Sequence, residues 1–177
     1  SSELDNFDIA GINAYNINGC TTPTAGLIIR RDDNFLDGVY SLSMEAGDGT
    51  VTFGSSNALN VSDSKKYYFN DIKHATMPSA SGIKDLIIQI VTDDTIVLPS
   101  NASQDASTCN IDGKIVSVHS PVNLHIYDSS NNHVGRGENG DIEYNITGVA
   151  YEEIGENKFV FLPESLGLSY RVELDGT

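Results

Sequence analysis

The pattern of hydrophobic and polar positions changes near the middle of the chain. Before about residue 99, short runs rich in β-branched and aromatic residues predict strands; they are "GLIIRR" (26–31), "GVYSLSMEA" (38–46) and "KKYYFNDI" (65–72). In "SGIKDLIIQIVTDD" (81–94) the apolar residues recur instead at helical spacing, with Ser79 or Ser81 available as an N-cap. Because strand, loop and helix follow in the order of an α/β unit, the pattern predicts an α/β-type domain for residues 1–98.

Beyond this part only strands and turns can be recognised. The polar stretch "PSNASQDASTCNIDG" (99–113) starts with Pro and ends on Asp-Gly, which predicts a linker. In "VNLHIYD" (122–128) Leu124 and Ile126 alternate with polar and aromatic residues, so they face one side of a sheet. Turn signals separate further runs of this kind, and residues 114–177 are predicted to form a small β-sandwich-like module. The predicted fold class is therefore α/β followed by all-β.

Composition limits the classes of partner. The chain of 177 residues has 25 acidic and 10 basic residues and a formal charge of -15. The only adjacent basic pairs are Arg30-Arg31 and Lys65-Lys66, so no nucleic-acid partner is expected. No stretch approaches the roughly 20 apolar residues of a membrane helix, so no membrane span is expected either. Acidity of this kind is typical of secreted or salt-exposed proteins, which favours an extracellular or cell-envelope location.

The two cysteines leave two interpretations open. Cys20 and Cys109 are far apart, and neither has a second thiol or a histidine at metal-binding spacing. They form one disulfide in an oxidising compartment, or they are two buried thiols. Spacing alone does not decide between these alternatives.

Two residues are candidates for catalysis. Asp48 lies between two glycines directly after a predicted strand, a setting that also suits a plain turn residue. His74 follows the predicted strand "KKYYFNDI" and precedes Pro78. Loops at the carboxyl ends of neighbouring parallel strands meet at one edge of a sheet, so the two side chains are expected to meet. Asp48 would then fix the tautomer of His74, whose other ring nitrogen serves as a base for a hydroxyl or thiol nucleophile.

These residues lie in segments that resemble a known family. "GDGTVTFGSS" (47–56) and "KHATMP" (73–78) resemble the acid and histidine segments of α/β-hydrolase lipases and acyltransferases. "GCTTPTAGLIIRRDD" (19–33) resembles the segment that often precedes the acid strand in secreted lipases. The resemblance covers roughly residues 15–92. It implies the C-terminal part of an α/β-hydrolase sheet, followed by an accessory module.

The resemblance also implies roles for individual residues. Asp48 matches the acid of a catalytic triad and His74 matches the general base. Gly47, Gly49 and Thr50 match the turn that supports the acid. The implied activity is that of a lipase or esterase, a serine hydrolase that acts on a carboxylic ester, in particular one with an acyl lipid.

The chain departs from the family in the nucleophile. A nucleophile elbow has the pattern G-x-S-x-G and precedes the acid, and this chain has no such motif. The closest string, "GSSNA" (54–58), follows the acid and lacks the second glycine, so Ser55 and Ser56 are predicted to start a helix. Position 52 is Thr where relatives often have proline. The chain is therefore expected to be a fragment, inactive alone, whose nucleophile lies in an upstream N-terminal remainder.

The other polar residues predict no site. The histidines of the second half, His119, His125 and His133, lack metal-ligand spacing and are taken as ordinary surface or half-buried residues. Asp128 starts a string like a calcium loop, but the required glycine and distal glutamate are missing, so a hairpin turn is predicted. No cofactor and no metal are expected.

Two other functions compete with the hydrolase fragment. In the first, the chain is a non-catalytic extracellular binding module, Asp48 is only a turn residue, and the β half binds a glycan, a lipid or a protein. In the second, it is a structural fragment whose incomplete sheet is completed by a partner chain. The hydrolase interpretation requires two partners, an ester or lipid substrate and the N-terminal remainder with the serine.

Overall fold

The computed structural model describes residues 11–31, 39–164 and 167–176, which belong to two compact units. Unit 1 extends to Thr24 and resumes from Glu45 to Asn110, whereas unit 2 takes Ala25–Met44 and the chain from Ile111 onward. Strands β2 (Thr22–Arg31) and β3 (Val39–Gly47) pair in a two-stranded sheet that contributes residues to both units.

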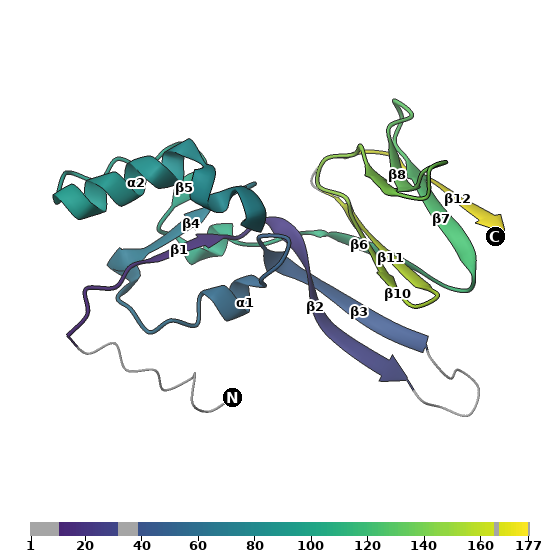
Figure 1. Ribbon diagram of the computed structural model, residues 1–177, viewed down its shortest axis with the longest axis horizontal. Coiled ribbons are helices and arrows are strands. Elements are labelled where there is room, and N and C mark those ends of the chain that lie inside the picture. The colour runs from purple at the N-terminus through teal and green to yellow at the C-terminus, as the bar shows by residue number, and fades with distance from the viewer. Residues whose placement is uncertain (1–10, 32–38, 165–166, 177) are drawn as a thin grey trace. The chain divides into compact units, whose positions relative to one another are not determined.

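Unit 1 contains a small sheet covered by the longest helix. Its strand order is β1 (Asn16–Gly19), β4 (Lys66–Phe69) and β5 (Ala102–Ser103); β1 is parallel to β4, and β5 is antiparallel to it (Figure 1). Helix α2 (Ser81–Thr92) packs on this sheet through a buried cluster of Tyr67, Phe69, Ile83 and Leu86. The helix predicted from apolar spacing is confirmed, but Ala80 occupies the N-cap, so no serine side chain caps it.

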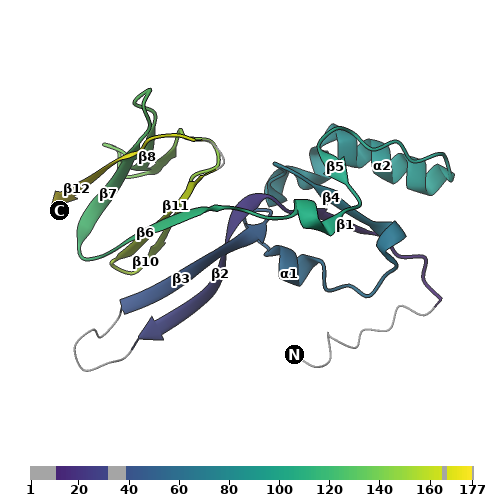
Figure 2. The ribbon, with the colours of Figure 1, turned by 180° about the vertical axis from the view of Figure 1, so that it is seen from behind.

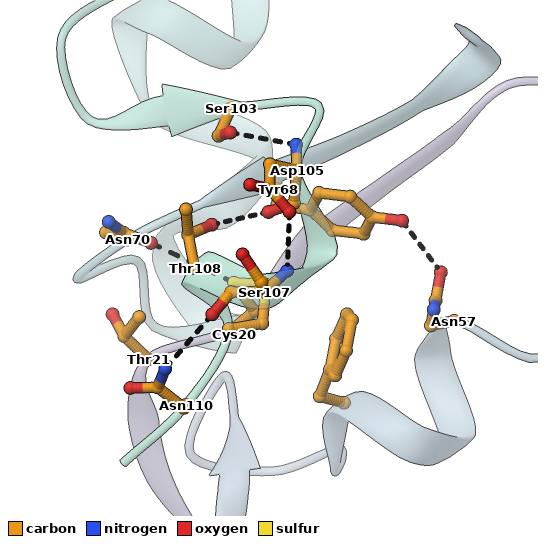
Figure 3. Close-up of a disulfide and its surroundings, with 12 residues drawn as sticks. Cys20, Thr21, Asn57, Tyr68, Asn70, Ser103, Asp105, Ser107, Thr108 and Asn110 are labelled. Carbon is orange, nitrogen blue, oxygen red and sulfur yellow. Dashed lines mark hydrogen bonds between the residues drawn. A yellow bond between two sulfur atoms is a disulfide. The ribbon is translucent and has the colours of Figure 1, made fainter. Parts of the chain in front are cut away.

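A disulfide bond packs against the other face of this sheet. Tyr68 alternates with Tyr67 and Phe69 along β4, so its ring points to the opposite face, where it forms a buried cluster with Cys20 and Cys109. Figure 3 shows Tyr68 and Cys20 in this region. These two cysteines are bonded to each other, which decides between the alternatives that spacing left open. The ring of Phe53, from the short helix α1 (Phe53–Ser56), meets Tyr68 edge-on at 5.5 Å between centroids.

The described part of unit 1 also contains three short 3-10 helices: η1 (Asp63–Lys65), η2 (His74–Ser79) and η3 (Ala106–Thr108). Part of the stretch predicted as a linker, residues 99–110, belongs to this unit. It supplies β5, η3 and Cys109.

Unit 2 contains two antiparallel sheets around one core. The first has the order β10 (Ala150–Ile154), β11 (Asn157–Pro163) and β6 (Gly113–His119). The second has the order β12 (Arg171–Gly176), β7 (Val122–Tyr127), β8 (His133–Arg136) and β9 (Ile142–Tyr144) (Figure 2). Leu124 and Ile126 are fully buried on one side of β7, as their alternation predicts. The core also contains Val134, Ile146, Val149, Tyr151 and Val160.

The predicted fold class, α/β followed by all-β, is wrong. The structure is 44% strand and 18% helical, and the described residues contain only one helix of seven or more residues. Both sheets of unit 2 are antiparallel, and the fold is that of a small β-rich domain and not of an α/β domain. Within the described ranges no helix has the length and apolar character needed to cross a membrane.

Candidate functional site

Asp48 lies directly after β3, in a tight loop that its own carboxylate closes. The residue is only 5% exposed, and its backbone bridges to Thr22 in parallel fashion. The carboxylate oxygen Oδ1 accepts hydrogen bonds from the backbone N–H groups of Thr50, at 3.0 Å, and Val51, at 2.7 Å. The second oxygen, Oδ2, is left free to accept from another part of unit 1.

His74 supplies that second contact. It is the first residue of η2, and its ring nitrogen Nδ1 lies 2.8 Å from Oδ2 of Asp48. Its backbone N–H also donates to the carbonyl oxygen of Asp48 at 2.8 Å. The two residues singled out in the sequence therefore meet, and attachment at two points fixes the imidazole against the acid loop.

Electrostatics keeps Asp48 ionised. Burial by itself would raise the pKa of the carboxyl group, but hydrogen bonds from Val51, His74 and Thr50 outweigh it, so the pKa lies below the ordinary value. An ionised carboxylate only accepts hydrogen bonds, so Nδ1 of His74 carries the proton. In a neutral imidazole the lone pair is then on Nε2. The side chain of His74 is 53% exposed, and its only hydrogen bond within the described residues is to Asp48.

Steric constraints explain why the turn around Asp48 has glycine at positions 47 and 49. Gly49 has a φ of +86°, a conformation that favours glycine, and its N–H donates to Oγ1 of Thr24 at 2.9 Å. A Cβ on Gly47 would lie 2.4 Å from Thr24 Oγ1 and from the carbonyl oxygen of Val51. Thr24, which is 2% exposed, therefore supports the acid loop from a neighbouring segment. Nothing in the string "TTPT" marks one threonine as buried, so the role of Thr24 could not be predicted from the sequence.

Gly19, at the end of β1, allows the acid and histidine loops to approach each other. A Cβ at this position would lie 2.9 Å from Asp48 Cβ, from the carbonyl oxygen of Ile72 and from the terminal methyl of Met77. The contact with Ile72 is with backbone, which cannot rotate away. A glycine at the end of a strand is common, so this role of Gly19 could not be predicted from the sequence either.

Within residues 11–31, 39–164 and 167–176, no hydroxyl or thiol contacts the ring of His74 as a nucleophile would. Ser55 and Ser56 lie in α1, and the hydroxyl of Ser56 donates to the carbonyl oxygen of Phe53 at 3.3 Å. No hydroxyl or thiol of the described residues hydrogen-bonds to the ring of His74. The described residues thus contain an acid and a base, but not a complete triad.

The remaining candidates lie in unit 2. Oδ1 of Asp128 accepts from the backbone N–H groups of Ser130, at 2.8 Å, and Asn132, at 2.9 Å, so this carboxylate closes its own turn. His119 contacts a side-chain amide, whereas His125 and His133 contact each other, which their spacing did not predict. No group of three or more His, Cys, Asp or Glu side chains in the described part of the chain is arranged to hold a metal ion.

No protein-family model, curated protein or solved structure matches the chain. The architecture shows no recognisable signature of the α/β-hydrolase fold. The assignment of a function therefore depends on the two sequence segments and on the contact between Asp48 and His74.

Proposed function

We propose that this chain supplies the acid and the histidine of a serine ester hydrolase, a lipase or esterase, whose nucleophile lies in polypeptide outside these 177 residues. The observation that carries the proposal is the 2.8 Å contact between His74 Nδ1 and Asp48 Oδ2. It joins a buried, ionised carboxylate to an exposed imidazole whose second nitrogen is available to a reactant. This is the geometry in which an acid orients a general base.

A turn role for Asp48 accounts for only part of this geometry. A turn residue needs only the hydrogen bonds that Oδ1 accepts from the N–H groups of Thr50 and Val51, which close the loop. It does not need a histidine on Oδ2, nor a histidine whose backbone N–H is fixed to the same loop. The additional contacts favour the acid–base interpretation over that of a non-catalytic module.

The proposed chemistry follows from the free nitrogen of His74. Nε2 takes the proton from a serine hydroxyl as the oxygen attacks the carbonyl carbon of a carboxylic ester. Asp48 stabilises the imidazolium that forms, and Nε2 then gives the proton to the departing alcohol. Water, activated by the same nitrogen, hydrolyses the acyl-enzyme. We further propose an acyl lipid as the substrate and an extracellular or cell-envelope location, which the Cys20–Cys109 disulfide fits.

The test is covalent labelling of the protein that contains this chain together with the polypeptide preceding it. A fluorophosphonate probe should label one serine outside the 177 residues. Labelling should be lost in His74→Ala and weakened in Asp48→Asn, but should persist in the control His119→Gln. A folded protein that is not labelled, or labelling that survives His74→Ala, would refute the proposal.

A further inference from the structure

Three polar side chains of unit 2 converge on a glycine that leaves room for them. His125 on β7 and Glu143 on β9 both pair with Gly135 on β8, and His133 lies two residues before Gly135 on the same face. Gly135 has a φ of +144°, and a Cβ on it would lie 3.0 Å from His133 Nε2 and 2.6 Å from the carbonyl oxygen of Leu124. The missing side chain creates the space in which the three groups meet.

The three groups form one hydrogen-bonded chain. His133 Nδ1 lies 2.8 Å from Glu143 Oε2, and His133 Nε2 lies 2.9 Å from His125 Nδ1. The two rings are within 20° of parallel. Because a carboxylate only accepts, His133 donates from Nδ1 and, as a neutral ring, has its lone pair on Nε2. That lone pair faces His125 Nδ1, and a single proton lies between the two nitrogens.

We propose that His125 and His133 bind a divalent transition-metal ion of the Zn²⁺ type, which takes the place of that proton. Zinc–imidazole bonds of about 2.0–2.1 Å in a tetrahedral site separate two ligand nitrogens by about 3.3 Å. The nitrogens of the pair, now 2.9 Å apart, therefore have to separate by about 0.4 Å, and the two rings have to tilt so that both lone pairs point at the ion. On binding, the proton of His125 moves from Nδ1 to Nε2, so both facing nitrogens present lone pairs.

Glu143 occupies the position of an orienting carboxylate. Metal-binding histidines commonly donate their second N–H to a carboxylate, which fixes the tautomer and the ring orientation. The bond from His133 Nδ1 to Glu143 matches this arrangement. Glu143 is thereby engaged, so the protein offers two nitrogen ligands and water fills the remaining positions of the ion.

The surroundings provide room for those waters and a favourable charge. A cavity of about 510 Å³ opens beside the pair, and its lining includes both histidines, Glu138 and Glu143. Arg136 also lines the cavity, but its guanidinium forms an ion pair with Glu153, with 2.5 Å between Nη2 and Oε2. The same group donates a hydrogen bond to the carbonyl oxygen of Gly140. Its charge is therefore balanced, and the acidic groups favour a cation. The ring of Tyr127, which also lines the cavity, stacks on His133 with 4.8 Å between the ring centroids and restricts its movement.

Calorimetric titration of the 177-residue chain with ZnCl₂ at neutral pH tests the proposal. One ion should bind per chain. His133→Gln and His125→Gln should each abolish binding, and Glu143→Gln should weaken it by about 10- to 100-fold, as for other orienting partners. The matched control is His119→Gln, a histidine of the same unit that contacts an amide, and it should bind as the unaltered chain does. Absence of saturable binding at millimolar Zn²⁺, or binding that survives His133→Gln, would overturn the proposal.

A spectroscopic measurement on the unaltered chain avoids any dependence on the folding of variants. In ¹⁵N-detected histidine spectra, Zn²⁺ should shift His125 Nδ1 and His133 Nε2 and remove the proton from His125 Nδ1. The signals of His74 in unit 1 should stay in place. If Zn²⁺ moves only His74 or His119, the site is not at Gly135. Neither experiment depends on ester hydrolysis, so the two proposals stand or fall separately.

Discussion

Replacing Asp48 by asparagine tests the coupling between the acid loop and His74. The amide keeps one oxygen, which can still accept from the N–H groups of Thr50 and Val51. Its NH₂ group then faces His74 Nδ1 and donates to it. We therefore expect the proton of His74 to move from Nδ1 to Nε2. This removes the lone pair from the position where the base is needed.

The size of the stability change follows from the bonds that the carboxylate makes. Hydrogen bonds to a charged group contribute about 1.5–3 kcal/mol each, against about 0.5–1.5 kcal/mol for neutral pairs. The carboxylate of Asp48 accepts from Thr50, Val51 and His74, and each of these bonds becomes neutral in Asp48→Asn. Removing a buried charge offsets part of the loss. We expect the free energy of unfolding of unit 1 to fall by about 2 kcal/mol.

Two measurements on the same sample check this expectation. Long-range ¹H–¹⁵N spectra report the tautomer of His74, and urea titration followed by the amide signals of Leu86 reports the stability of unit 1. The amide of Leu124, in the core of unit 2, serves as an internal reference. Asp85→Asn, an exposed position on α2, makes the same change of charge and should alter neither quantity. An unchanged tautomer in Asp48→Asn, or a stability loss no larger than that of the control, would refute the reasoning.

Three other changes address the scaffold of the site. The Cys20–Cys109 disulfide joins residues that are 89 positions apart in the sequence. In the chain-entropy model, its loss should lower the free energy of unfolding of unit 1 by about 4–5 kcal/mol. The urea midpoint of unit 1 in a variant with both cysteines replaced by serine measures this change. Gly19→Ala should destabilise unit 1 by about 1–3 kcal/mol, because the new Cβ would clash with the carbonyl oxygen of Ile72. The control is Gly54→Ala, which should cause no such clash, because no atom lies within 4 Å of the position of its Cβ. Because the pKa of Asp48 is lower in the folded state than its ordinary value of 3.8, its contribution to stability is complete above about pH 5 and is lost as the pH falls below 3.8. Acid unfolding curves should therefore show a weaker pH dependence in Asp48→Asn, and equal slopes would contradict this.

Local patterns predicted individual elements better than their arrangement. The apolar spacing that predicted α2 and the alternation along β7 are properties of single segments, and the structure confirms both. Strands β1 and β8 were missed because "NING" and "HVGR" are four residues long and contain glycine and polar residues. The fold class was wrong because the direction in which strands pair depends on contacts between distant segments. Such contacts leave no periodic trace in the sequence.

The candidate sites also contain residues that a local sequence pattern identifies and residues whose roles depend on contacts between distant segments. Asp48 and His74 could be singled out because each follows a strand-like run and lies in a distinctive short motif. Thr24 and Gly19 could not, since one acts through a tertiary hydrogen bond and the other through the absence of a side chain. Metal binding at the His125–His133 pair could not be anticipated either, because it depends on the register of two strands.

The contact between Asp48 and His74 forms within this chain. Asp48 is fixed by the backbone of its own loop, and His74 is fixed to that loop by its ring and its main chain. A segment that completes a hydrolase site therefore needs to bring only a hydroxyl within hydrogen-bond distance of Nε2 and donors for the developing oxyanion. Such a segment would also cover the side chain of His74, which is 53% exposed in this chain. Under the proposed function, His74 should be protected from chemical modification in a protein that joins this chain to the segment with the serine, but not in this chain alone. Equal reactivity in both would contradict the proposal.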